Sequence, residues 1–176
     1  MRIRPADLHD LSACFELDGS FETDHVWQLD HRADESGIVV QFRTVRLPRR
    51  MKVAYPPRGD SLLAHWERGE GIYVAAESRH VKGYIEVLAQ TDQGIAWIQN
   101  LIVDQALRRQ GLGTALAAVA AQWAQMRGLD RLLAPVQSKN YPAIRFCQKL
   151  GMEFCGYNDH YFANRDIALL FGRSLS

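Results

Sequence analysis

Apolar residues recur with helical spacing over residues 112–126, the strongest periodic signal in the chain. The apolar positions in this stretch are Leu112, Ala115, Leu116, Val119, Ala120 and Trp123. Residues three or four positions apart lie on the same side of an α-helix, so the pattern predicts an amphipathic helix with one buried face. Gly128 follows at the position where a glycine commonly ends a helix.

Short apolar runs before and after this helix predict strands. Residues 72–77, 81–89 and 95–103 are separated by short turns, so they are expected to form an antiparallel meander. Residues 130–136 are connected to 95–103 through the helix and are therefore expected to run parallel to that strand. This order of elements predicts an α+β fold with one central βαβ crossover.

A second helix and two strands are expected after residue 137. Asn140 is a suitable N-cap for this helix, and Gly151 a suitable end. The apolar face of the helix is expected to contain Ala143, Phe146, Cys147 and Leu150. Residues 153–162 and 167–173 are expected to form two closing strands.

The first part of the chain is less periodic. Residues 2–4 predict a short strand, and a helix is expected after Pro5, with Asp7 as its N-cap. The apolar face of that helix is expected to be Leu8, Leu11 and Phe15. Residues 20–37 are polar and aperiodic and predict an irregular segment.

A locally basic hairpin is expected at about residues 38–55. Residues 38–45 and 51–55 predict its strands and residues 47–50 its turn. Charged side chains keep an exposed sheet edge from pairing with other chains; alternatively, they bind an acidic ligand or partner. The cationic residues are Arg43, Arg46, Arg49, Arg50 and Lys52. A turn over residues 56–59 and a short helix capped by Ser61 are expected to follow.

The composition excludes several classes of protein. The length of 176 residues fits a single domain over 1–176, and the 47% apolar content excludes a disordered chain. The net charge of +1 provides no general attraction for nucleic acid or anionic membranes. No apolar run approaches the roughly 20 residues that span a bilayer, and the N-terminus does not resemble a secretory signal. Three cysteines without a CxxC pair fit neither a disulfide framework nor a zinc site. We therefore expect a soluble cytoplasmic protein, monomeric or homodimeric, without a metal.

A glycine-containing loop leads directly into the 112–126 helix. It follows strand 95–103 and contains Arg108, Arg109, Gly111 and Gly113. A helix N-terminus presents unpaired N–H groups at the positive end of the helix dipole, so it binds phosphate groups. Glycine lets the backbone approach the anion closely, and the two arginines add positive charge. The sequence therefore predicts an anion-binding loop.

Two common nucleotide-binding loops do not match this stretch. A P-loop carries a lysine directly after its second glycine, whereas Thr114 follows Gly113 here. A dinucleotide-binding fold needs three glycines after the first strand of a parallel sheet. In this chain Ala115 and Leu116 follow Gly113, and the preceding strands are expected to be antiparallel.

The spacing Arg108-x-x-Gly111-x-Gly113 resembles the acyl-CoA pyrophosphate loop of the GNAT superfamily of N-acetyltransferases. Residues 140–152, NYPAIRFCQKLGM, are similar to that family's second motif, and residues 3–11 to its opening strand and helix. The resemblance covers 70–173 well and 1–19 loosely, but not 20–60. It implies a mixed, mostly antiparallel sheet of about seven strands with helices on both faces.

The resemblance also implies acetyl-CoA as the acyl donor. In this family the strand before the loop splays away from its parallel neighbour, and the pantetheine arm of CoA pairs with backbone groups in the gap. Here those groups would belong to Leu101, Ile102 and Val103. Asn140 would contact the cofactor near its reactive end. The pyrophosphate would bind to the loop formed by Arg108, Arg109, Gln110, Gly111, Leu112, Gly113 and Thr114.

Attack of an amine on a thioester needs a group that accepts the amine's proton and a group that protonates the leaving thiolate. The family commonly has a Tyr for the second task where this chain has Cys147, and many relatives have a Glu where it has Gln99. Glu86 is the best remaining candidate for the base, and Cys147 or Tyr161 for the acid. Alternatively, Cys147 is a small core residue and Glu86 lies on an exposed face of the sheet.

The leading hypothesis is an acetyl-CoA-dependent N-acetyltransferase that acts on a primary amine of a small molecule or peptide. The alternative is an acyl-CoA-binding sensor or inactive homologue, which Gln99 and Cys147 favour. Binding of nucleic acid by the basic hairpin is disfavoured by the neutral net charge. Aromatic and acidic residues suit a cationic acceptor; the candidates are Glu22, Asp24, His25, Tyr157, Asn158, Asp159, His160 and Tyr161.

Overall fold

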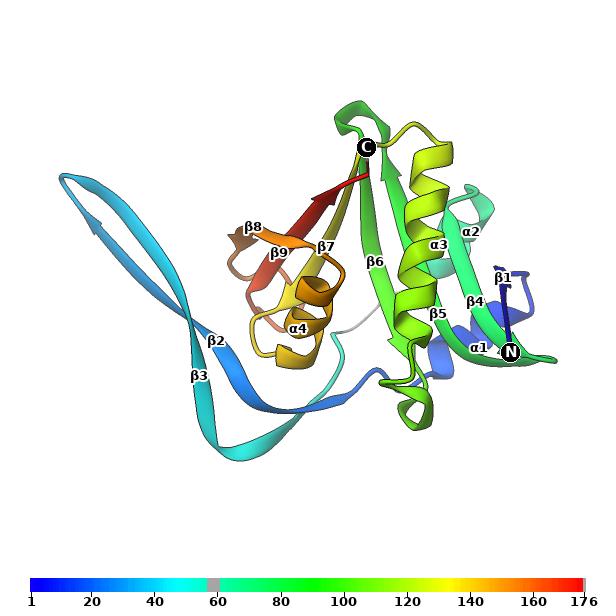
Figure 1. Ribbon diagram of the computed structural model, residues 1–176, viewed down its shortest axis with the longest axis horizontal. Coiled ribbons are helices and arrows are strands. Elements are labelled where there is room, and N and C mark those ends of the chain that lie inside the picture. The colour runs from blue at the N-terminus through cyan, green and yellow to red at the C-terminus, as the bar shows by residue number, and fades with distance from the viewer. Residues whose placement is uncertain (57–60, 176) are drawn as a thin grey trace.

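The computed structural model describes residues 1–56 and 61–175, and seven strands within these ranges form one sheet. The strands are β1 (Arg2–Pro5), β4 (Gly71–Glu77), β5 (His80–Gln90), β6 (Ile95–Val103), β7 (Arg131–Gln137), β8 (Glu153–Asn158) and β9 (Ala168–Ser174). They follow the order β1-β4-β5-β6-β7-β9-β8. Only the β6–β7 pair in this sheet is parallel, which confirms the predicted α+β fold (Figure 1).

Helices cover both faces of the sheet, as predicted. The α-helices are α1 (Asp10–Glu16), α2 (Leu62–Glu67), α3 (Leu112–Met126) and α4 (Tyr141–Lys149), and short 3₁₀ turns cover Thr91–Gln93 and Gln105–Leu107. Leu116 of α3 and Ile144 of α4 belong to one buried cluster, and Leu11 of α1 and Leu62 of α2 belong to another. The long helix α3 connects β6 to β7 and forms the expected crossover.

The start of α1 differs from the prediction. The Asp7 carboxylate accepts a hydrogen bond from the His9 N–H at 2.9 Å, but the helix itself begins at Asp10. Because Leu8 precedes the helix, it does not share the buried face and is 53% exposed; Phe15 is also exposed, at 38%. Leu11 and Cys14 are the buried apolar residues of this helix.

The prediction of an irregular segment over residues 20–37 is wrong. Strand β2 (Phe21–Asp34) pairs with β3 (Gly37–Val53) in a two-stranded antiparallel ribbon that projects from the body (Figure 1). The predicted hairpin at 38–55 is wrong for the same reason. Its expected turn at 47–50 is a bulge opposite Asp24, and the real turn is at Glu35-Ser36. Strand alternation is weak here because most residues of the ribbon are in contact with water, so few apolar side chains mark its faces.

Smaller differences concern caps and strand ends. Ser61 precedes α2, but its side chain makes no capping hydrogen bond. Strand β8 ends at Asn158, earlier than expected, and a loop connects it to β9. The expected turn at 56–59 lies largely outside the described residues. No helix in the described ranges is both long and apolar enough to cross a membrane.

Candidate active site

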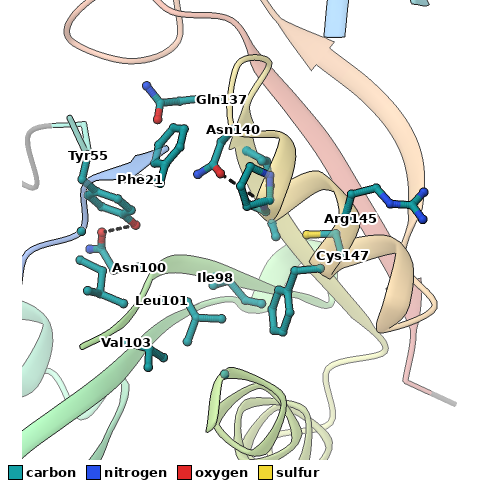
Figure 2. Close-up of a pocket in the computed structure, with 18 of the residues that line it drawn as sticks. Phe21, Tyr55, Ile98, Asn100, Leu101, Val103, Gln137, Asn140, Arg145 and Cys147 are labelled. Carbon is teal, nitrogen blue, oxygen red and sulfur yellow. Dashed lines mark hydrogen bonds between the residues drawn. The ribbon is translucent and has the colours of Figure 1, made fainter. Parts of the chain in front are cut away.

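A cleft opens where β6 and β7 diverge. The two strands pair only at Ile95–Trp97 with Arg131–Leu133, and beyond Trp97 they separate (Figure 1). A bulge helps to bend β6 there, because Glu86 of β5 pairs with Asn100 and Val87 pairs with Ile98. The gap is part of a cleft of about 590 Å³ lined by β6, β7, α4 and the start of α3 (Figure 2).

The loop between β6 and α3 has the geometry of an anion site. Arg109 and Gly111 both have positive φ, 66° and 91°, which turns successive N–H groups toward one side. Gly111 is the N-cap of α3 and has no side chain to cap the helix. The N–H groups of Leu112, Gly113 and Thr114 therefore form the positive end of the helix dipole, and no side chain of the N-cap residue binds them.

Arg108 is used mainly to hold this loop in place. Its Nε donates to the Val103 carbonyl at 2.9 Å, and its two terminal nitrogens donate to the carbonyls of Ser20 and Asp18 at 2.6 and 2.8 Å. Burial lowers the pKa of the Arg108 guanidinium from its usual range. Arg109, in contrast, is exposed at the mouth of the cleft.

Asn140 caps α4, as its sequence position predicts. Its Oδ1 accepts a hydrogen bond from the Ala143 N–H at 3.1 Å. Since the oxygen is used in this way, the amide nitrogen is the part of Asn140 that remains to donate into the cleft. Figure 2 shows that nitrogen turned away from the helix end.

Cys147 lies in the wall of the cleft on the buried face of α4. It is only 4% exposed, and burial raises the pKa of its thiol to about 12. The side chain therefore stays a protonated thiol at neutral pH, and it is a weak acid for a departing thiolate. It also packs in the main buried cluster, which fits the alternative of a small core residue.

Cys147→Ala is expected to retain at least a tenth of the wild-type kcat, because a thiol with such a raised pKa gives up its proton with difficulty. Steady-state kinetics with acetyl-CoA would measure this. Cys14→Ala, which removes an equally buried thiol from the other side of the sheet, controls for the cavity left behind. A thousandfold loss at normal CoA affinity in the Cys147 variant alone would make this thiol the acid.

Glu86 is neither solvent-exposed nor part of the cleft surface. It is 1% exposed and accepts hydrogen bonds from two buried partners, His65 of α2 and Asn100 of β6. Asn100 Nδ2 donates to the Glu86 carboxylate at 2.5 Å, and Asn100 Oδ1 accepts from the Tyr55 hydroxyl at 3.1 Å. Tyr55 and Asn100 both line the cleft (Figure 2). The carboxylate is thus connected to the cleft through Asn100.

The residues proposed for the acceptor are not part of the cleft wall. Among the described lining residues, none of the predicted acceptor positions is present, although Phe162 is. Tyr161 is 37% exposed and packs on Trp97, with ring centroids 6.3 Å apart; partial burial raises its pKa. His25 packs against Tyr141 of α4 at 5.0 Å, and Glu22 pairs with Arg50 at 3.5 Å.

Gln137, at the end of β7, was not predicted from the sequence. It is 2% exposed and lines the cleft beside Phe21 (Figure 2). Its Nε2 donates to Asp166 at 2.7 Å, but its buried Oε1 accepts no hydrogen bond from any described residue. A polar residue in an otherwise apolar strand is the signal that could have identified it, as for Asn100 in β6.

Asp166 fixes the direction of the Gln137 amide. Burial alone would raise the pKa of this carboxyl, but hydrogen bonds from Lys139, Gln137 and Asn164 outweigh it and lower the pKa. An ionised carboxylate only accepts hydrogen bonds, so the amide nitrogen must face Asp166 and the oxygen must face away. The unpaired oxygen is therefore a fixed feature of the site.

Comparisons with known proteins agree with this geometry. The chain matches the acetyltransferase (GNAT) family over residues 14–152. It is 30% identical to the streptothricin acetyltransferase of Streptomyces lavendulae in an alignment 165 positions long that covers 87% of this chain and 82% of that protein. The crystal structure of nourseothricin acetyltransferase is similar with a TM-score of 0.83 and 23% identity, covering 99% of this chain and 98% of that one. A putative streptothricin acetyltransferase from Bacillus anthracis, crystallised with acetyl coenzyme A, has a TM-score of 0.76 and 21% identity over 98% and 96% of the chains.

Proposed function

Because the chain belongs to the acetyltransferase (GNAT) family and is an acetyl-CoA-dependent N-acetyltransferase, we propose that its acceptor is an amine of a streptothricin-class antibiotic. The observation that carries this proposal is the 30% identity to a streptothricin acetyltransferase over 87% of the chain. The similarity in fold to nourseothricin acetyltransferase over 99% of the chain supports it. The free thiols of Cys147, which is buried, and Cys155, which is exposed, fit a reducing compartment, so we also propose a cytoplasmic location.

The proposed placement of acetyl-CoA follows the geometry of the cleft. The unpaired edge of β6 at Leu101–Val103 suits the pantetheine arm, and the uncapped start of α3 suits the pyrophosphate. Arg109 adds charge at the mouth, while Arg108 holds the loop in shape. The free amide nitrogen of Asn140 is in a position to donate to the cofactor near its thioester.

In the reaction, the neutral amine forms a C–N bond with the thioester carbonyl, the C–S bond breaks, and the amine loses a proton. We propose that water in the cleft takes that proton and that Asn100 and Tyr55, whose hydrogen bonds connect the cleft to Glu86, orient this water. Cys147 forms part of the cleft wall and would lie beside the leaving sulfur when acetyl-CoA is bound. Tyr161 stays a prediction for the acid that protonates the leaving thiolate. It does not line the cleft, so the loop between β8 and β9 would have to move toward the cleft for it to act.

We propose that Gln137 binds the acceptor. Its Oε1 is a buried acceptor without a partner in the described chain, and such a group is costly unless something donates to it. An amine N–H of the substrate is a suitable donor. The hydrogen bond to Asp166 keeps the oxygen pointing in one direction, so the site is already arranged before the substrate arrives.

Gln137→Leu is expected to raise the KM for the acceptor about fivefold, which corresponds to roughly 1 kcal/mol for one hydrogen bond. The KM for acetyl-CoA is expected to change less than twofold. Gln125→Leu is the control, because Gln125 lies on α3 outside the cleft lining, where its side-chain amide donates to the Leu175 carbonyl. An equal rise in both KM values for Gln137→Leu would contradict a role in acceptor binding.

The proposed function is tested by a thiol-release assay with a panel of amines: streptothricin, polyamines, aminoglycosides, amino acids and peptides with free N-termini. Streptothricin is expected to have the highest kcat/KM. Turnover only on another amine would show that the proposed acceptor is wrong, but the assignment as an N-acetyltransferase would stand. Binding of CoA without turnover on any amine would favour the acyl-CoA sensor.

A further inference from the structure

His65 of α2 reaches the hydrogen bonds of Glu86, Asn100 and Tyr55 from the side away from the cleft. Its Nδ1 is hydrogen-bonded to one oxygen of the Glu86 carboxylate, and Asn100 Nδ2 donates to the other at 2.5 Å. His65 is 8% exposed and is not among the described residues that line the cleft. Figure 1 shows α2 beside β4, away from the opening between β6 and β7. His65 is therefore not placed to touch the substrates, and a contribution to the reaction would pass through Glu86.

The Glu86 carboxylate needs a hydrogen-bond donor at each of its oxygens. Glu86 is 1% exposed, and a buried negative charge is costly unless hydrogen bonds compensate for the lost water. Asn100 satisfies Oε2, and His65 satisfies Oε1 by donating from Nδ1. If the donor at Oε1 is removed, the protonated carboxylic acid becomes more favourable than the carboxylate. His65 thus stabilises the ionised form of Glu86.

The protonation state of Glu86 decides which way the Asn100 amide points. An ionised carboxylate only accepts hydrogen bonds, whereas a carboxylic acid also donates. While Glu86 only accepts, the nitrogen of Asn100 must face it, and Asn100 Oδ1 is left to accept from the Tyr55 hydroxyl at 3.1 Å. A protonated Glu86 could bind either end of the amide, so this direction would no longer be fixed. Asn100 and Tyr55 both line the cleft, so a change at His65 is transmitted to its wall.

Helix α2 holds His65 in one position. Leu62, one turn earlier, is 3% exposed in the buried cluster on this side of the sheet, and the Trp66 indole donates to the Ala6 carbonyl at 2.9 Å. The carbonyl of His65 accepts from the Glu70 N–H at 3.1 Å, which closes the end of the helix. Because the backbone is anchored on both sides of His65, the imidazole loses little further freedom when it binds Glu86.

We propose that His65 is a positioning residue for acetyl transfer: its Nδ1–H keeps Glu86 ionised and thereby fixes the Asn100 amide and the Tyr55 hydroxyl at the cleft. This inference rests on the proposed function, in which Asn100 and Tyr55 orient the water that takes the amine's proton. A residue that acts in this way changes kcat and leaves the binding of acetyl-CoA unaltered, because it lies outside the cleft.

The experiment compares His65→Leu with His65→Asn, using acetyl-CoA and the amine of the panel that is turned over fastest. Leucine and asparagine have the same branched shape, so both variants leave the same space, but only asparagine can donate in place of Nδ1. His65→Leu is expected to lower kcat roughly fivefold, within the range for one hydrogen bond, and His65→Asn is expected to stay within about twofold of the wild type. An unchanged calorimetric affinity for CoA shows that both variants are folded.

Two further measurements connect the effect to Glu86. In the Glu86→Gln background the Leu and Asn variants are expected to have equal kcat within about twofold, because no carboxylate is left to keep ionised. Nitrogen-15 NMR of the wild type with labelled histidine is expected to show a proton on Nδ1 of His65 that exchanges slowly with water. Its absence from His65→Asn assigns the signal, and the measurement needs no active variant.

Equal losses of kcat in His65→Leu and His65→Asn would show that His65 only fills space, and a His65→Leu chain with wild-type kcat would show that it has no role. The same difference between the two variants in the Glu86→Gln background, or an Nδ1 without a proton, overturns the inference as well. Failure of the proposed function looks different. Turnover of an amine other than streptothricin changes the acceptor but not this test, whereas wild-type kcat in Glu86→Gln, or no turnover of any amine, overturns the positioning role together with the proposed function.

Discussion

Glu86→Gln is expected to lower kcat/KM by roughly 10²-fold, the lower end for loss of a general base. The substitution preserves the shape of the side chain but removes the negative charge that accepts hydrogen bonds from both His65 and Asn100. A neutral amide both donates and accepts, so it no longer forces the Asn100 nitrogen toward position 86. The Asn100 oxygen then loses its fixed direction toward Tyr55 and the cleft.

Measurements of kcat/KM against pH separate two ways in which Glu86 contributes. If its carboxylate takes up the amine's proton through water, the acidic limb of the profile moves or flattens in the variant. If it only orients Asn100, the profile keeps its shape at a lower level, and Tyr55→Phe lowers the rate in the same way. Glu70→Gln is the control, since Glu70 also accepts a hydrogen bond within the sheet, from the Ala89 N–H at 2.9 Å. A Glu86 variant within threefold of the wild type would rule out both roles.

Gly111→Val is expected to weaken CoA binding at least tenfold, about 1.4 kcal/mol. Gly111 has φ of 91° at the start of α3, a conformation that a β-branched residue rarely adopts. The added side chain also stands where the backbone must approach the pyrophosphate closely. Calorimetric titration with CoA would measure the change.

Gly128→Val provides the control for backbone strain. Gly128 follows the other end of α3 with φ of 71°, and a Cβ would meet no atom within 4 Å at either glycine. Both variants are expected to lose stability, but only Gly111→Val is expected to lose CoA affinity. An unchanged dissociation constant for CoA in a folded Gly111→Val chain would show that this loop does not bind CoA.

The sequence by itself determined the central part of the fold. The predicted bounds of β6 and α3 match the structure, and Asn140 caps α4 as expected. These elements are buried on at least one face, so selection for packing leaves a regular pattern of apolar residues and clear end signals. The loop from Arg108 to Thr114 could be identified for a similar reason, because its glycines and its position before a helix follow from local backbone geometry.

Only the tertiary structure decided how distant segments meet. Gln137 and Asp166, or Glu86 and His65, are far apart in the sequence, and no local pattern indicates that they are hydrogen-bonded. The ribbon was missed because its strands are stabilised by each other and by contact with β8, whereas local periodicity reports burial against the protein's own core. Local sequence thus specified the central elements and the anion loop, while long-range contacts decided where the ribbon pairs and which polar groups are buried, oriented and left free in the cleft.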